Sequence, residues 1–127
     1  YAERMGYWSH AIDWIGDKPL KGWGLDSSRM FSPGIELHPH DGALQVWLEL
    51  GVVGGVASAA FWVVTLLRLV RPRPDPAMDA TAACAAVYLL FGAINFGIWQ
   101  EWWLALGALI ATLAALNQPS TAPHLSE

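Results

Sequence analysis

Two histidines and an aspartate stand directly before the longest apolar run of the chain. The segment reads His38, Pro39, His40 and Asp41, and the apolar run opens at Gly42. A neutral imidazole can take a proton from an acceptor hydroxyl, so this segment predicts a general base. The proline between the two histidines stiffens the backbone and limits how the rings point. Polar groups gathered at a membrane surface are costly to keep and are usually there for function.

Two other interpretations of this histidine pair remain open. Neutral imidazole is also a common metal ligand, although no further His or Cys lies at a familiar ligand spacing. The pair can also be two solvated loop histidines at the start of a helix, and residue types alone do not separate this interpretation from the base. Asp41 by itself is expected to be the N-cap of the following helix.

Two other charged residues are candidates for a role at a membrane surface. Arg4 lies four residues before Trp8, one turn away on a predicted helix. A guanidinium matches phosphate oxygens bidentately and keeps its charge, although an exposed arginine paired with Glu3 or Asp13 is the simpler interpretation. Glu49 is the unusual acid, because a carboxylate within an apolar run must reach the interface or find a partner.

The polar N-terminal third of the chain must position these groups. Residues 1–17 are expected to form a short amphipathic helix, because their apolar side chains recur at helical spacing. The residue before Pro19 is pushed out of the helical region, which ends this helix. Residues 18–41 are rich in Gly, Pro, Ser and Asp and predict an ordered loop. Residues 1–41 are therefore expected to form one extramembrane segment.

Three apolar runs predict transmembrane helices, at residues 42–67, 80–98 and 104–116. At about 1.5 Å per residue the first would reach roughly 39 Å, beyond the roughly 30 Å hydrocarbon core of a bilayer. Its first two turns are therefore expected in the headgroup region, with Gln45 and Glu49 near the polar side.

The segments between these runs predict an orientation. Residues 68–79 hold three arginines among several prolines, which indicates a cytoplasmic loop by the positive-inside rule. Residues 99–103 hold three tryptophans, a composition typical of an interfacial aromatic belt, here at a turn on the outer side of the membrane. Residues 117–127 are expected to be a disordered tail.

The composition agrees with a membrane protein. The 127 residues are 54% hydrophobic and 14% charged, against about 25% charged residues in soluble domains. The net charge of −4, with no Lys/Arg-rich run, does not support nucleic-acid binding. The single Cys84 forms no internal disulfide. Because the chain starts without Met or a signal peptide, we expect an all-α fragment of a polytopic membrane protein, packed on upstream transmembrane helices.

Taken in order, these pieces resemble the C-terminal part of the O-antigen ligase and polymerase superfamily. The resemblance covers roughly residues 3 to 70, and the later helices agree only in hydropathy. The matching pattern is Arg4-x-x-x-Trp8, Ala11, Pro19-Leu20-x-Gly22-x-Gly24 and His38-Pro-His40-Asp41-x-x-Leu44-Gln45-x-x-x-Glu49-Leu50-Gly51-x-x-Gly54.

The resemblance implies a multi-pass glycosyltransferase of the bacterial inner membrane that acts on the periplasmic face without a metal or other cofactor. Such proteins move a glycan from an undecaprenyl-diphosphate carrier to an acceptor hydroxyl. The acceptor is the lipid A-core of lipopolysaccharide or a growing polysaccharide. By position, His40 matches the histidine that activates the acceptor, and Arg4 matches the arginine that holds the carrier diphosphate. His38 would be a supporting, substrate-binding group.

This chain departs from the family in two respects. The family usually has Asn after the activating histidine, whereas this chain has Asp41, whose charge would either orient the ring of His40 or blunt its basicity. The family also has many more helices and a further essential arginine upstream, so the fragment alone is not expected to catalyse. The alternative hypothesis is a truncated, non-catalytic membrane module that binds lipid-linked glycan or partner helices.

Overall fold

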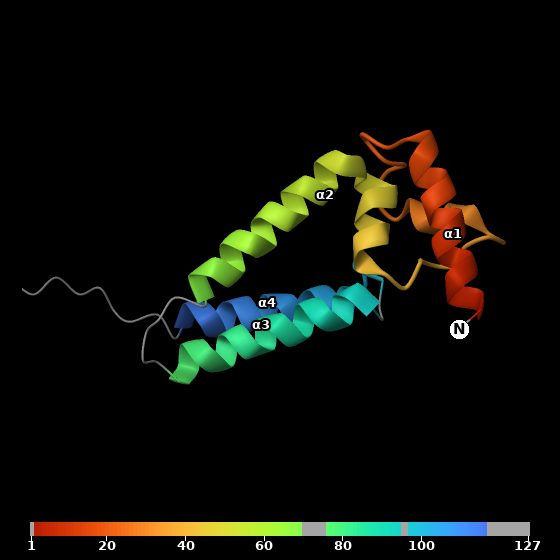
Figure 1. Ribbon diagram of the computed structural model, residues 1–127. Helices are drawn as coiled ribbons and strands as arrows, with labels where there is room; N and C mark the ends of the chain where they lie inside the picture. Colours follow the sequence, from red (N-terminus) through yellow and green to blue (C-terminus); the bar gives the residue numbers. More distant parts are fainter. Residues whose placement is uncertain (1, 70–75, 95–96, 117–127) are drawn as a thin grey trace, which may run out of the picture.

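The computed structural model describes residues 2–69, 76–94 and 97–116, and all regular structure in these ranges is helical. This confirms the predicted all-α class. Helix α1 packs on α2, α2 packs on α3, and α3 packs on α4 (Figure 1). In chain order the elements are α1 (Ala2–Asp17), the 3₁₀ helix η1 (Ser27–Phe31), α2 (Gly42–Leu69), α3 (Pro76–Ile94) and α4 (Glu101–Leu116).

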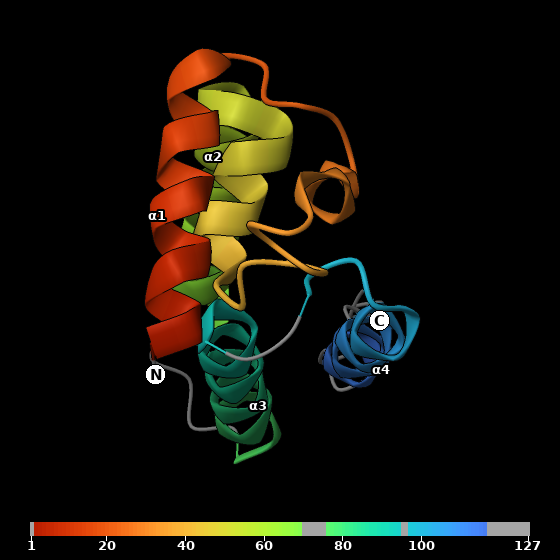
Figure 2. The same ribbon diagram turned by 90° about the vertical axis from the view of Figure 1, so that its right-hand side faces the viewer.

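Helix α2 is broken at Gly51, where φ is 65° and ψ is −167°. Glycine reaches a positive φ at little steric cost because it has no Cβ. The first half of α2 lies beside α1, and the second half runs away from it (Figures 1 and 2). Helix α2 is therefore not one continuous helix. It has a shorter part before Gly51 (residues 42–50, here called its first half) and a longer part after it (residues 52–69, its second half).

The loop that follows α1 docks into this break. Carbonyls before Gly51 and N–H groups after it lose their partners within the helix, and the loop supplies replacements. Four backbone hydrogen bonds make this junction: Trp23 N to Leu48 O at 3.0 Å, Gly24 N to Glu49 O at 2.8 Å, Val52 N to Pro19 O at 2.8 Å and Val53 N to Leu20 O at 3.4 Å.

Two glycines allow the loop and the helix to meet backbone to backbone. A Cβ at Gly22 would lie 2.4 Å from the carbonyl carbon of Glu49. A Cβ at Gly51 would lie 2.3 Å from the carbonyl oxygen of Leu20. Neither contact leaves space for a side chain, and both glycines also have a positive φ. Two glycines of the sequence pattern, Gly22 and Gly51, are thus explained by one shared contact.

An apolar core joins α1, the loop and the first half of α2. Its buried members come from all three parts, so the loop is held on both sides. Partly buried aromatic rings, among them Trp14 and Trp23, pack against this core. The buried residues are Ala11, Ile15, Phe31, Ile35 and Leu48.

The second half of α2 leaves large apolar side chains uncovered. Val53, Val56 and Phe61 are 65%, 64% and 62% exposed. By length and composition, α2 and α3 are each able to cross a membrane, and α4 is a shorter apolar helix. Extended apolar surface of this kind marks a site that faces lipid or other protein segments.

The helix ends differ in part from the predicted boundaries. Helix α3 begins at Pro76, within the predicted loop at 68–79, because proline is tolerated in the first turn of a helix. It ends at Ile94, before the predicted end at residue 98. Helix α4 begins at Glu101, within the predicted turn at 99–103. Residues 70–75 and the expected disordered tail at 117–127 lie outside the described residues.

The tryptophans of this turn do not share one environment. Trp102 is 50% exposed. Trp103 is only 5% exposed, and its ring stacks on Tyr88 with the centroids 4.2 Å apart. Trp103 therefore packs between α3 and α4, and the aromatic belt stays a prediction for this turn.

Candidate active site

The two histidine rings lie against each other and beside helix α1. The ring centroids of His38 and His40 are 4.2 Å apart, and Tyr7 on α1 stacks on His40 at 6.3 Å. The indole N–H of Trp8 donates to the carbonyl of Pro39 at 3.0 Å. His40 has a φ of 53°, in the left-handed region. This turn, together with the restricted Pro39, fixes where the two rings meet.

Arg4 joins the same helix to the end of α3. Its Nη1 donates to the carbonyl of Ile94 at 3.2 Å. Ile94 is the last residue of α3, where carbonyls lack helical partners and carry partial negative charge. A guanidinium is well suited to this position, and Arg4 remains exposed there. Three residues of α1 thus make contacts with neighbouring segments. Arg4 contacts the end of α3, and Tyr7 and Trp8 contact the histidine segment.

His38 is buried, with 8% of its surface exposed. The backbone of Gly97 lies against its ring, since a Cβ there would be 2.8 Å from His38 Cδ2. The Nδ1 atom of His38 is buried and has no hydrogen-bond partner in the part of the chain that the structure describes. His40 is half-buried by comparison, so it is the more accessible of the two rings.

Burial lowers the pKa of His38, because the charged imidazolium loses its hydration. The neighbouring His40 and the charge of Arg29 act in the same direction. The carboxylates of Glu49 and Asp26 raise the pKa but do not offset these effects. His38 is therefore the neutral imidazole at neutral pH, and it packs beside His40 without adding a charge.

Glu49 is fully buried in the first half of α2. Its Oε1 accepts from Ser28 Oγ at 2.7 Å, Gln45 Nε2 at 3.1 Å and Ser28 N at 3.4 Å. Its Oε2 accepts from Asp26 N at 2.9 Å and from the indole N–H of Trp99. A buried carboxylate is costly unless hydrogen bonds replace its hydration, and here neutral donors from three segments do so.

This hydrogen-bond network holds the segments on both sides of His38. Ser28 Oγ also lies 3.2 Å from the carbonyl of Leu37, the residue before His38. Gln45 Oε1 accepts from the N–H of Ile98 at 3.0 Å, next to the Gly97 backbone that touches His38. Glu49 therefore acts on the histidine segment through its neighbours.

The sequence predicts Gln45 and Glu49 near the polar side of the membrane but does not predict this network. Both side chains are 2% exposed or less. The available signal is their i, i+4 spacing, which puts two polar side chains on one side of an apolar helix. Their partners Asp26, Ser28 and Trp99 lie far away in the sequence, so the spacing indicates a polar pair but not its surroundings.

Asp41 is the N-cap of α2, as predicted. Its Oδ1 accepts from the N–H of Leu44 at 2.9 Å, and its carbonyl accepts from the N–H of Gln45 at 2.9 Å. The carboxylate therefore has a structural role at the helix start.

The metal interpretation of the histidine pair requires further ligands. The described residues contain no group of three His, Cys, Asp or Glu side chains placed to share one ion.

Proteins of two Rickettsia species are similar to this chain. A protein of Rickettsia conorii named "Putative polysaccharide ligase RC0486" is 29% identical over 91% of this chain and 31% of its own length. A protein of Rickettsia prowazekii, "Putative polysaccharide ligase RP358", is 28% identical over 91% of this chain and 32% of its own length. No family model and no solved structure matches the chain.

The names of these relatives are consistent with the resemblance to the O-antigen ligase type that the sequence pattern indicates. Together with the two apolar helices, they indicate a membrane protein. The chain spans about a third of the length of the relatives that it matches.

Proposed function

We propose that this chain carries the transfer site of an O-antigen ligase-like glycosyltransferase. The enzyme would move a glycan from an undecaprenyl-diphosphate carrier to a hydroxyl of lipid A-core or of a growing polysaccharide. The observation that carries the proposal is the His38–His40 pair, held against α1 at the head of a broken apolar helix. The names of the rickettsial relatives support the class of reaction.

In this proposal His40 is the general base. Its half-buried ring accepts the proton of the acceptor hydroxyl while that oxygen bonds to the anomeric carbon of the glycan. The bond from that carbon to the carrier diphosphate breaks, and the diphosphate leaves with the electron pair. His38, whose lowered pKa keeps it neutral, packs against His40 at 4.2 Å and limits its movement.

Arg4 is proposed to bind the leaving diphosphate. A guanidinium binds phosphate oxygens through parallel N–H groups and stabilises the negative charge that develops. Arg4 is exposed where α1 meets the end of α3, and it already binds an oxygen acceptor there, the Ile94 carbonyl. The site would then lie at the periplasmic face of the bacterial inner membrane, close to a lipid-linked donor.

The test is complementation of a bacterium that lacks its own ligase or polymerase, scored by the ladder of long polysaccharide on a gel. We expect the full-length wild-type protein to restore the ladder and the same protein carrying His40→Ala to fail to restore it. Glu36→Ala is a matched control, because Glu36 is an exposed residue in the same loop and should retain the ladder.

A His40→Ala protein that restores a full ladder would contradict the role of His40. If neither wild type nor variant restores the ladder while both are present in the membrane, the non-catalytic module becomes the better description. Arg4→Ala adds a second readout, since it should reduce the use of the diphosphate carrier at equal protein levels.

A further inference from the structure

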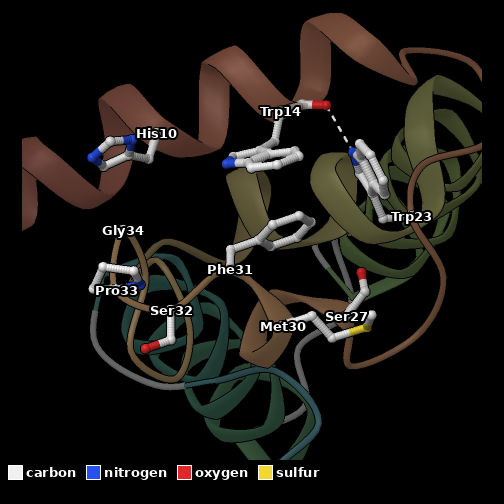
Figure 3. A pocket seen from close by; sticks show the side chains of 9 residues that line it. All are labelled: His10, Trp14, Trp23, Ser27, Met30, Phe31, Ser32, Pro33 and Gly34. Atoms are coloured by element: carbon white, nitrogen blue, oxygen red, sulfur yellow. Dashed lines mark hydrogen bonds between the residues drawn. The ribbon is translucent and has the colours of Figure 1, made fainter.

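A half-open hollow of about 610 Å³ lies between α1 and η1 (Figure 3). This volume is within the roughly 300–1,000 Å³ of typical small-molecule sites. Arg4, His38 and His40 are not among the residues that line it. The residues that matter for its chemistry are His10, Trp14, Trp23, Ser27, Phe31 and Gly34.

One part of the hollow is a rigid aromatic wall. The rings of Trp14 and Phe31 have centroids 4.6 Å apart. Trp23 packs edge-on against both, at 5.2 Å and 5.4 Å. Its indole N–H donates to the carbonyl of Trp14 at 2.8 Å (Figure 3). Because these contacts fix the rings, Trp14 and Phe31 form a preorganised apolar surface. The ring of Trp23 is covered by the Lys18 ammonium, 3.8 Å from its centroid.

Polar groups accompany this wall. Ser27 is 4% exposed, and its Oγ has no hydrogen-bond partner among the described residues. Figure 3 shows this hydroxyl directed toward Trp23, another residue that lines the hollow. Buried polar groups are nearly always hydrogen-bonded in native proteins, and a hydroxyl can both donate and accept. An unpartnered hydroxyl that lines a hollow therefore points to a ligand that has hydroxyl groups.

His10 supplies a second polar group at the end of the hollow away from Trp23 (Figure 3). Its ring lies over the backbone of Gly34, since a Cβ at Gly34 would be 3.1 Å from His10 Cγ. Glycine at this position lets the imidazole come close to the loop. The imidazole is exposed, so its nitrogens can both donate to and accept from a bound molecule in the neutral form.

We propose that this hollow binds one pyranose ring of a glycan, other than the ring that reacts at His40. The carbon–hydrogen face of the sugar would pack on Trp14 and Phe31, and its hydroxyls would bond to Ser27 Oγ and to His10. An acyl chain would fill the aromatic part but would leave the Ser27 hydroxyl unpaired. The assignment of a glycan rests on the proposed function, which supplies that class of substrate.

The experiment measures binding directly, in protein held in phosphatidylethanolamine and phosphatidylglycerol nanodiscs, because maltoside detergents are themselves sugars. The probe is the oligosaccharide released by mild acid from the surface polysaccharide of the producing strain. Saturation-transfer difference NMR gives its dissociation constant. We expect Ser27→Ala and His10→Ala each to weaken binding about three- to ten-fold, the range for one lost hydrogen bond. Ser9→Ala, an exposed neighbour on α1, should not change it.

Circular dichroism establishes that each variant keeps its helices, and replacement of Trp14 is avoided because it packs on the core. Absent binding to wild type, or binding that both variants retain within about two-fold, would overturn the subsite. The proposed function fails separately, through a His40→Ala protein that still restores the polysaccharide ladder. Oligosaccharide binding that remains sensitive to Ser27→Ala would support the subsite even then.

Discussion

At the scale of single residues, the most consequential side chain is Glu49, although it stands within an apolar run. Its carboxylate accepts hydrogen bonds from the loop, from its own helix and from the turn before α4. An acid in this position cannot rely on water, so its partners must be supplied by the fold. The carboxylate thereby joins three segments that meet around the histidine pair.

We predict that Glu49→Ala destabilises the protein by about 2–5 kcal/mol, because several buried donors lose their acceptor at once. Glu101→Ala, at an exposed carboxylate in the same chain, is the control and should change stability little. Thermal unfolding of the two variants in nanodiscs makes the comparison. Equal melting temperatures would show that the Glu49 network does not hold the loop.

His38 predicts a pH dependence of stability. Its pKa in the folded protein lies below the ordinary value of 6.5, mainly because of burial. Below that ordinary value the unfolded chain binds a proton that folded His38 does not, so protonation favours unfolding. The free energy of unfolding should therefore have its full value above about pH 6.5. It should decrease as the pH falls through the lower pKa of His38 in the folded protein.

Unfolding experiments between pH 7.5 and 5.0 test this dependence, with His38→Gln beside wild type. The variant should lose part of the decrease seen in wild type, since glutamine does not titrate. His10→Gln, at an exposed helix position, should keep the wild-type dependence. A wild-type profile that is flat over this range, or one that His38→Gln reproduces, would contradict the prediction.

At the scale of elements, the junction of loop 19–24 with the break in α2 decides the architecture. The loop replaces hydrogen bonds that the helix gives up at Gly51. This exchange explains why Gly22 and Gly51, which are far apart in the sequence, belong to one structural feature. It also explains why the first half of α2 packs with α1 while the second half is left with its apolar side chains exposed.

We predict that Gly22→Ala destabilises the junction, because its Cβ would lie 2.4 Å from backbone atoms of Glu49. Backbone atoms cannot give way as a flexible side chain does, so we expect a loss of about 2 kcal/mol or more. Gly55→Ala is the matched control, since nothing lies within 4 Å of a Cβ there. It should be neutral or slightly stabilising, because alanine favours a helix.

Chemical unfolding of both variants provides the measurement. If Gly22→Ala and Gly55→Ala proved equally stable, the loop would not make the close backbone contact described above. If both proved equally unstable, the effect would come from the loss of any glycine, and the junction would lose its special role.

At the scale of the whole molecule, the polar groups and the exposed apolar side chains are found at different ends. One end carries the loop, the histidine pair and the Glu49 network, and the other carries exposed apolar helices. The proposed orientation places residues 2–41 and the turn at 97–100 in the periplasm. The end of α2 near Arg68 would then lie on the cytoplasmic side, in agreement with the positive-inside rule.

Cysteine labelling in intact cells tests this orientation. In a background that carries Cys84→Ser, we expect Glu36→Cys and Gln100→Cys to react with a membrane-impermeant maleimide added outside. Arg68→Cys should react only after the membrane is opened. Labelling of Arg68→Cys in intact cells, or protection of both other positions, would reverse or refute the proposed topology.

Much of the fold could be predicted from the sequence, because the signals are local. Apolar runs, the proline that ends α1 and the Asp41 cap each depend on residues that are close along the chain. The composition likewise indicates a membrane protein, since few of its residues are charged. The break at Gly51 has no such signal, because a glycine within a helical pattern is usually tolerated without a change of direction.

The tertiary structure alone decided how the candidate site is assembled. The contact of Tyr7 with His40 and the bond of Trp99 to Glu49 join residues more than thirty and about fifty positions apart. The burial of His38 against Gly97 is equally distant in the sequence. The sequence by itself determined the apolar spans and the ordered polar motif. Which polar groups meet depends on how the loop docks into the broken helix, and local propensities carry no information about that docking.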